Sequence, residues 1–303
     1  MSFPPGIEGL AHARFGPHNR KLSNRREMRF GRKGSISVRL DDGRYYDYEN
    51  QRGGHLIKPT RLSYTLPKQR VWRAKHVGQE PTRLERKNLL ACGIWHNSSP
   101  LNIYDEAGQP TGPNPDADPA IRYLGGRAIE LWPWPETLAF ARLKHPETKE
   151  PNVPTLIVAR QCPVSGLLRG VQRIYLTEDG HKYQSGTVKM SLGPIPGGRV
   201  ELIPATGTKL AIAEGVESAL SAHILLGIPA WACCGSFPDT FALPSQISEV
   251  VIVADHDASG GSEKRAKALR SSIRRACRVE VEVFLPDTEG QDANDVLACS
   301  HGH

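Results

Sequence analysis

The chain has 303 residues, of which 39% are hydrophobic, and this composition suffices for two or three folded domains. No apolar run approaches the roughly 20 residues of a membrane span, and the first residues lack a signal-peptide core, so a cytoplasmic location is expected. The six cysteines show no Cys-x-x-Cys spacing, so the sequence indicates neither a disulfide framework nor a zinc site.

Charge is distributed unevenly along the chain. Residues 1–90 contain 20 Lys and Arg against 8 Asp and Glu, whereas residues 91–303 contain 19 and 24. A basic segment of this kind is typical of proteins that neutralise nucleic-acid phosphates, and a solvated basic surface is the alternative. The candidate phosphate contacts are Arg25, Arg26, Arg29, Arg32 and Lys33.

A β-hairpin is predicted directly after these cations. Residues 34–40 alternate polar and apolar side chains, residues 41–43 read Asp-Asp-Gly, and residues 44–48 are rich in tyrosine. Alternation on both sides of an Asp-Gly turn favours two paired strands. Gly53-Gly54 then predicts a tight turn.

This rhythm resembles the zinc-ribbon domain that opens bacterial-type primases. The resemblance lies in Ser35–Val38, Tyr45-Tyr46 and Gly53-Gly54. No cysteine precedes Cys92, so the metal ligands of such a ribbon are missing and no zinc is expected. We therefore expect residues 1–90 to form a basic, β-rich, ribbon-like domain that is held by packing.

The middle of the chain, residues 91–200, predicts a small mixed α+β region. Residues 110–119, with four prolines, predict a linker. Residues 120–127 resemble the short helix that phage and plasmid primase-like proteins place before their catalytic core. Residues 156–160 and 170–176 are expected to be strands.

Three basic residues of this region are candidate contacts for a triphosphate or for a template backbone. Gly170-x-x-Arg173 and Lys189 resemble a basic ridge that lies next to the catalytic acids in primase-like relatives, and Arg169 lies beside them. Ordinary surface cations are the alternative. The sequence has no Gly-x-x-x-x-Gly-Lys-Ser/Thr loop, so helicase or ATPase activity is not expected.

The last third alternates buried strands with helices. Residues 209–215 and 249–257 are short apolar runs, each followed by a helical pattern, at residues 216–226 and 262–276. A further strand is expected over residues 279–285. This βαβ order predicts a parallel sheet with flanking helices.

Five carboxylates lie at the predicted strand ends and in a later turn. Glu214 ends the first apolar run, and Asp255 and Asp257 end the second. Carboxyl ends of parallel strands bind ligands, and side chains two apart on extended backbone share one side, so one Mg²⁺ or Mn²⁺ would contact both aspartates. Solvated turns are the alternative. Asp292 and Asp295 lie three apart, which suits either the same site or the N-cap of a helix.

These motifs resemble the Toprim family over residues 202–298, with a strand ending in Glu-Gly, a strand ending in Asp-x-Asp and a later acidic turn. The resemblance implies a Rossmann-like Toprim domain in residues 201–303 and Mg²⁺-dependent phosphodiester chemistry. Asp255 and Asp257 would hold the metal, Glu214 would be a general base or a second-metal ligand, and Asp292 and Asp295 would complete the site.

The domain order favours a primase-like nucleotidyltransferase that makes short primers on single-stranded DNA from nucleoside triphosphates. By resemblance, it would serve a plasmid, an integrative element or a phage, with a separate helicase as partner. A Toprim nuclease would use the same acids, and a non-catalytic nucleic-acid-binding adaptor is the third possibility. The chain is too short for the gated scaffold of a topoisomerase.

Overall fold

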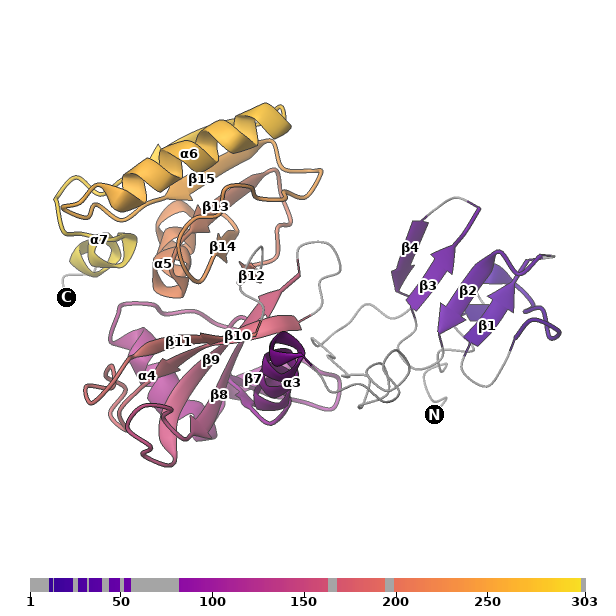
Figure 1. Cartoon of the computed structure of the whole chain (residues 1–303), viewed down its shortest axis with the longest axis horizontal. Coiled ribbons are helices and arrows are strands. Elements are labelled where there is room, and N and C mark those ends of the chain that lie inside the picture. The colour runs from indigo at the N-terminus through magenta and orange to yellow at the C-terminus, as the bar shows by residue number, and fades with distance from the viewer. Residues whose placement is uncertain are drawn as a thin grey trace. The chain divides into compact units, whose positions relative to one another are not determined.

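The computed structural model describes residues 11–12, 14–23, 27–31, 33–39, 44–49, 52–55, 82–162, 168–193 and 199–300 (Figure 1). The chain forms two compact units, Met1–Val71 and Trp72–His303. Helix α3 (Arg83–His96) belongs to the second unit, so the domain boundary predicted after residue 90 falls inside a helix. No described helix is long and apolar enough to cross a membrane.

The first unit contains a four-stranded antiparallel sheet in the order β1-β2-β3-β4. Its strands are β1 (Glu27–Phe30), β2 (Ile36–Arg39), β3 (Arg44–Asp47) and β4 (Arg52–His55). Met28, Phe30 and Val38 are buried and form a small core with Ala11. The predicted hairpin is confirmed, because β2 and β3 pair with Val38 opposite Tyr45.

The turn predicted at Gly53-Gly54 is wrong. Both glycines lie in β4, where Gly53 pairs with Tyr46 and Gly54 with Tyr45. A glycine opposite an aromatic residue leaves room for the aromatic ring to lie across the strand, so this pairing suits a strand as well as a turn.

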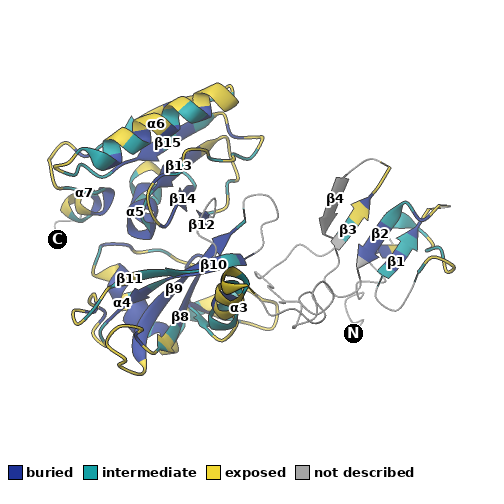
Figure 2. Cartoon of the chain, viewed as in Figure 1, coloured by how far each residue is buried: buried dark blue, intermediate teal, exposed yellow. Residues whose placement is uncertain are grey.

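The first half of the second unit is a five-stranded antiparallel sheet in the order β11-β10-β9-β8-β5. Its strands are β5 (Ser99–Pro100), β8 (Leu138–Leu143), β9 (Val153–Gln161), β10 (Leu168–Tyr175) and β11 (Lys189–Leu192). Strand β9 is buried along its whole length, so both faces of the sheet are covered (Figure 2). The two strands predicted here from the sequence, at residues 156–160 and 170–176, are confirmed.

The linker predicted at residues 110–119 is wrong. These residues form β7 (Pro110–Pro113), which pairs with β6 (Asn102–Tyr104), then the turn η1 (Pro115–Ala117) and the start of α4 (Asp118–Gly125). Prolines are tolerated in a two-stranded ribbon and in the first turn of a helix, where no backbone N–H is needed. Ala117 is fully buried, which anchors the segment in the core.

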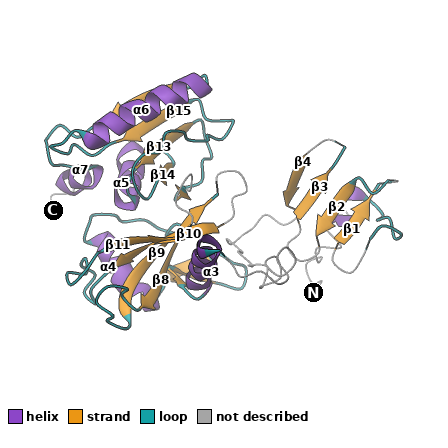
Figure 3. Cartoon of the chain, viewed as in Figure 1, coloured by secondary structure: helices purple, strands orange, loops and turns teal. Residues whose placement is uncertain are grey.

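The second half is a five-stranded sheet in the order β12-β14-β13-β15-β16, flanked by helices (Figure 3). Its elements are β12 (Val200–Glu201), β13 (Lys209–Ala213), α5 (Val216–Leu226), β14 (Ala230–Ala232), β15 (Glu249–Val253), α6 (Gly261–Ala276), β16 (Glu280–Phe284) and α7 (Ala293–Ser300). All pairs except β12 with β14 are parallel. The predicted α/β class with a C-terminal parallel sheet is confirmed.

Alternation along β13 assigns the helices to the two faces of this sheet. Leu210 and Ile212 share a core with α6, whereas Ala211 and Ala213 share a core with α5 and α7. The core that contains Ala211 and Ala213 also contains residues of β9 and α4, so the two halves of the unit pack on one another through α5.

Candidate active site

The ends of two neighbouring parallel strands position the predicted acids. Ala213, the last residue of β13, pairs with Val253, the last residue of β15. Glu214 follows the first of these directly, and Asp255 follows the second after one buried alanine. Because both strands run in the same direction, both carboxylates lie at the same edge of the sheet.

Asp255 has a carboxylate oxygen without a partner. Its Oδ1 atom is buried and makes no hydrogen bond, while its backbone N–H donates to Ser262 Oγ at 3.1 Å. Burial, together with the negative charges of Asp292, Glu214 and Asp257, raises the pKa of Asp255 to about 6. A buried, unpaired carboxylate oxygen among other acids is where a cation would be most stabilising.

Glu214 is held by a cation and an amide. Its Oε1 accepts from Arg265 Nε at 3.0 Å and from the Phe237 N–H at 3.3 Å, and its Oε2 lies 3.5 Å from Arg265 Nη2. The side chain is only 15% exposed. Arg265 of α6 therefore neutralises Glu214, and a ligand that recruited Glu214 would have to displace this guanidinium.

Asp257 caps helix α6. Its Oδ1 accepts from the Gly261 N–H at 3.0 Å and its Oδ2 from the Ser262 N–H at 2.9 Å, and the Ser259 hydroxyl donates as well. These hydrogen bonds, that of Ser259 first, lower its pKa to about 2. Extended backbone was expected to place Asp257 and Asp255 on one side, but β15 ends at Val253 and the two carboxylates lie in a loop with different partners.

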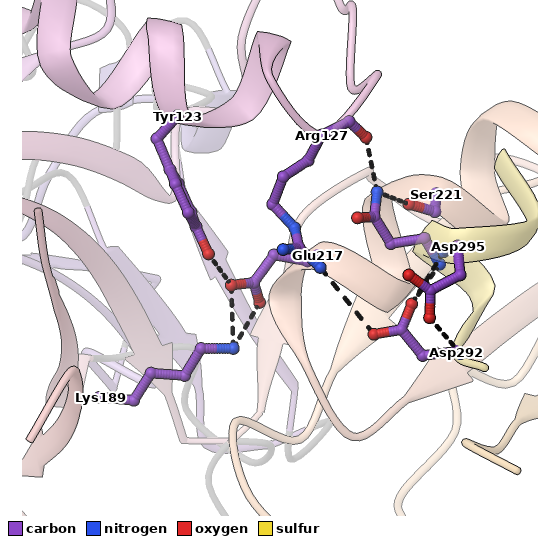
Figure 4. A network of polar contacts seen from close by, with 8 residues as sticks. Tyr123, Arg127, Lys189, Glu217, Ser221, Asp292 and Asp295 are labelled. Atoms are coloured by element: carbon purple, nitrogen blue, oxygen red, sulfur yellow. Dashed lines mark hydrogen bonds and ion pairs between the residues drawn. The ribbon is translucent and has the colours of Figure 1, made fainter. Parts of the chain in front are cut away.

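Asp292 and Asp295 form a capping box at the start of α7. Asp292 Oδ1 accepts from the N–H groups of Asn294 (2.7 Å) and Asp295 (3.0 Å), and Asp295 Oδ2 accepts from the Asp292 N–H at 2.9 Å (Figure 4). The capping alternative is thus confirmed. Asp292 also lies 3.9 Å from Arg127 Nη2, and its charge still acts on Asp255.

The acids of this site differ in how well they suit a divalent cation. Among the described residues, no three His, Cys, Asp or Glu side chains are arranged to hold one ion. Asp255 fits such an ion, because its buried oxygen lacks a partner, whereas Glu214 and Asp257 are engaged by protein groups. Of these three acids, Asp255 therefore offers the oxygen that no protein group engages, and further protein ligands for an ion would require local rearrangement.

Sequence analysis missed the most buried acid of this region, Glu217 in the first turn of α5. Only 3% of the residue is exposed, and its carboxylate accepts a hydrogen bond from the Tyr123 hydroxyl (Figure 4). Lys189 Nζ lies 2.9 Å from Glu217 Oε1 and 3.0 Å from Oε2. Burial alone would raise the pKa of Glu217, but the charge of Lys189 and these hydrogen bonds lower it to about 2. Its position three residues after Glu214 was the available signal.

Comparison with known families decides the nature of this sheet. Residues 209–303 match the family described as Toprim domain. The C-terminal part of the chain is a Toprim domain. Residues 89–202 match a second family, described as a domain of unknown function (DUF7146). Tyr123 and Lys189 belong to this second match, so the Glu217 network joins it to the Toprim domain.

Several solved structures are similar to this chain at low sequence identity. The zinc-binding and RNA polymerase domains of the Aquifex aeolicus primase are 14% identical over 99% of this chain and 83% of that chain, with a TM-score of 0.45. A DNA primase domain from Pseudomonas aeruginosa is 12% identical over 70% of this chain and 74% of that chain, with a TM-score of 0.45. The primase fragment of the bacteriophage T7 primase-helicase protein is also 12% identical, over 89% of this chain and 90% of that chain, with a TM-score of 0.41. No curated protein matches the chain.

The predicted basic ridge is split by strand alternation. Arg173 of β10 pairs with Met190 and its neighbour Ile174 pairs with Lys189, so the Arg173 and Lys189 side chains lie on opposite faces of the sheet. Lys189 is on the face that packs against the Toprim domain, where its charge reaches Asp255. Arg169 lies close enough to the buried Arg160 to lower the pKa of that guanidinium, after burial itself.

The predicted phosphate contacts of the first unit are placed only in part. Arg29 Nε pairs with Glu27 Oε1 at 2.8 Å, and its guanidinium lies 5.3 Å from the centre of the Tyr48 ring. Lys33 is exposed. The other three candidates, Arg25, Arg26 and Arg32, lie outside the described residues.

Proposed function

We propose that the chain is a metal-dependent nucleotidyltransferase of the DNA primase type, which makes short primers on single-stranded DNA. The observation that carries this proposal is the unpartnered, buried oxygen of Asp255 at the strand ends of a Toprim domain, with the Lys189 ammonium nearby. A negatively charged triphosphate needs both a metal and a cation to offset its charge.

The chain's own residues divide the work of such a reaction. Asp255 would hold Mg²⁺ or Mn²⁺, which supplies Lewis-acid stabilisation of phosphate oxygens when bound. Lys189, held at Glu217, would place a positive charge where a triphosphate approaches. Glu214 would act as base or as a further metal ligand after Arg265 turns away, with Asp257, Asp292 and Asp295 maintaining the loops around it.

The order of the domains favours primer synthesis over cleavage. A basic β-rich unit precedes an antiparallel sheet, and this sheet brings Lys189 to the Toprim acids. A separate helicase would open the template, because the sequence has no phosphate-binding loop of its own. By its resemblance to phage and plasmid primase-like proteins, we assign it to replication of a mobile element.

Incubation with single-stranded DNA, labelled nucleotides and Mg²⁺ or Mn²⁺ tests this proposal. Wild type should extend new chains, Asp255→Asn should not, and the exposed control Asp287→Asn should behave as wild type. Shortening of the template in place of synthesis would identify a nuclease, which would use the same acids. Full activity of Asp255→Asn would refute a role for the Toprim acids.

A further inference from the structure

The positive charge of the Toprim domain is concentrated in one helix. Residues 209–303 contain eight Lys and Arg, and seven of them lie between Lys264 and Arg278. The same residues contain 13 Asp and Glu, none of which lies within that segment. The segment from Lys264 to Arg278, which covers most of α6 and the two residues after it, is therefore basic within an acidic domain.

The cations of α6 are aligned on its outer side. Ala266, Leu269 and Ile273 are buried against the sheet. At about 100° per residue, four cations lie on the side opposite to these, together with the uncharged Ala268 and Ser271. The outer stripe, as we call it below, consists of Lys264, Lys267, Arg274 and Arg275, all of them exposed. Figure 2 shows this outer face of α6 as exposed along the helix.

Few protein groups neutralise the outer stripe. Lys267 Nζ pairs with Glu263 at 2.6 Å, and Arg274 Nη2 donates to the Val281 carbonyl at 3.0 Å. Among the described residues, the side chains of Lys264 and Arg275 have no hydrogen bond or ion pair. The stripe thus keeps charge available for an external anion.

The stripe has the length of a nucleic-acid backbone contact. From Lys264 to Arg275 the helix rises about 16 Å, a length that spans a few neighbouring phosphates of one duplex strand. No aromatic residue occurs in residues 261–278, so the surface offers nothing for stacking unpaired bases. Cations without stacking side chains suit a duplex, whose bases are paired and whose phosphates are dense.

The N-terminal end of α6 lies at the candidate active site. The amides of Gly261 and Ser262 bind Asp257, and Arg265 of the same helix pairs with Glu214. We infer that the outer stripe binds the phosphate backbone of a nucleic-acid duplex. This inference rests on the proposed function, since the duplex would be the template paired with its new primer.

Salt-dependent binding tests the inference with a matched control. Lys264→Gln/Arg275→Gln removes two charges from the stripe, and Arg83→Gln/Lys87→Gln removes two exposed charges from α3. Fluorescence anisotropy would follow a labelled duplex and a single strand of equal length. Each lost duplex contact should lower the slope of log affinity against log salt by about 0.9, so the affinity gap to wild type should shrink about 12-fold between about 50 and 200 mM salt.

The outcomes separate this inference from the proposed function. A duplex slope that changes in the stripe variant but not in the α3 variant supports the inference. An unchanged slope would show that the stripe is a solvated helix face, and an equal change for single-stranded DNA would show that it does not select duplex. Either result overturns the inference and does not affect the synthesis test with Asp255→Asn. Conversely, a failure of the synthesis test would overturn the proposed function and would not affect the binding data.

Discussion

Replacing Asp255 by Asn should stabilise the metal-free protein while it abolishes activity. The carboxylate is buried on one oxygen, has no partner there, and lies near three other acids. An amide of the same shape removes the charge that burial and repulsion disfavour. The substitution should therefore raise the free energy of unfolding, whereas replacing an aspartate that is held by stabilising partners would lower it.

The size of the effect follows from the pKa. A rise in the pKa of Asp255 from 3.8 to about 6 means that its charge destabilises the folded state by about 3 kcal/mol, at about 1.4 kcal/mol per pKa unit. The side chain is only partly buried, and solvent screening reduces this to about 1–2 kcal/mol. The folded state binds the proton more tightly than the unfolded state, so the cost is full above pH 6 and disappears as the pH falls below about 4.

Urea unfolding in EDTA at pH 7.5 would measure this difference. All five tryptophans lie in Trp72–His303, so tryptophan fluorescence follows the second unit. With a slope of about 3 kcal/mol per molar urea, the midpoint of Asp255→Asn should rise by about 0.3–0.7 M. At pH 4 the gain should nearly vanish, and Asp287→Asn should leave the midpoint unchanged.

Added Mg²⁺ should reverse the order of stability. Wild type gains stability from any ion that binds the folded state, and Asp255→Asn should gain much less. A lower midpoint for Asp255→Asn in EDTA would refute the reasoning, because it would show that the carboxylate has a stabilising partner. Equal responses of both proteins to Mg²⁺ would refute its role as the metal anchor.

Three further substitutions test the surrounding structure. Glu217→Gln should lower the free energy of unfolding by about 3 kcal/mol at pH 7, because Lys189 and Tyr123 lower the pKa of Glu217 from 4.5 to about 2. The urea midpoints of wild type and variant should converge as the pH falls from 4.5 to 2. Tyr123→Phe should cost about 1.5–3 kcal/mol in the same assay, because one hydrogen bond to a charged group is lost. Gly180→Ala should cost more than about 1 kcal/mol, because φ is +81° and the new Cβ would lie 2.6 Å from Arg122 Cβ; a variant as stable as wild type would contradict this.

Local patterns predicted the C-terminal elements well and the Gly- and Pro-rich segments poorly. The helix expected over residues 216–226 has the same bounds as α5, because its buried face and its glycine at each end are encoded within the segment. Gly53-Gly54 and residues 110–119 were misread, since glycine and proline permit turns but pairing with a distant strand decides the outcome. Strand pairing is not visible in a short window of sequence.

The candidate site shows the same limit at the level of side chains. The rule that parallel strands end at ligand sites correctly placed Glu214 and Asp255 at one edge of the sheet. It did not predict that Arg265 would neutralise Glu214 or that an oxygen of Asp255 would lack a hydrogen-bond partner. Partners of a carboxylate come from other elements, so they depend on packing that no local spacing encodes.

The Glu217 network connects folding of the two matched segments to the chemistry proposed for the site. A buried carboxylate is stable only if its charge is paired, and both of its side-chain partners, Tyr123 and Lys189, come from the segment before the Toprim domain. The Toprim segment alone would therefore leave Glu217 unpaired, and the preceding segment alone would leave Lys189 without its anchor. Because the same lysine acts electrostatically on Asp255, docking of the two segments also sets the charge balance of the candidate active site.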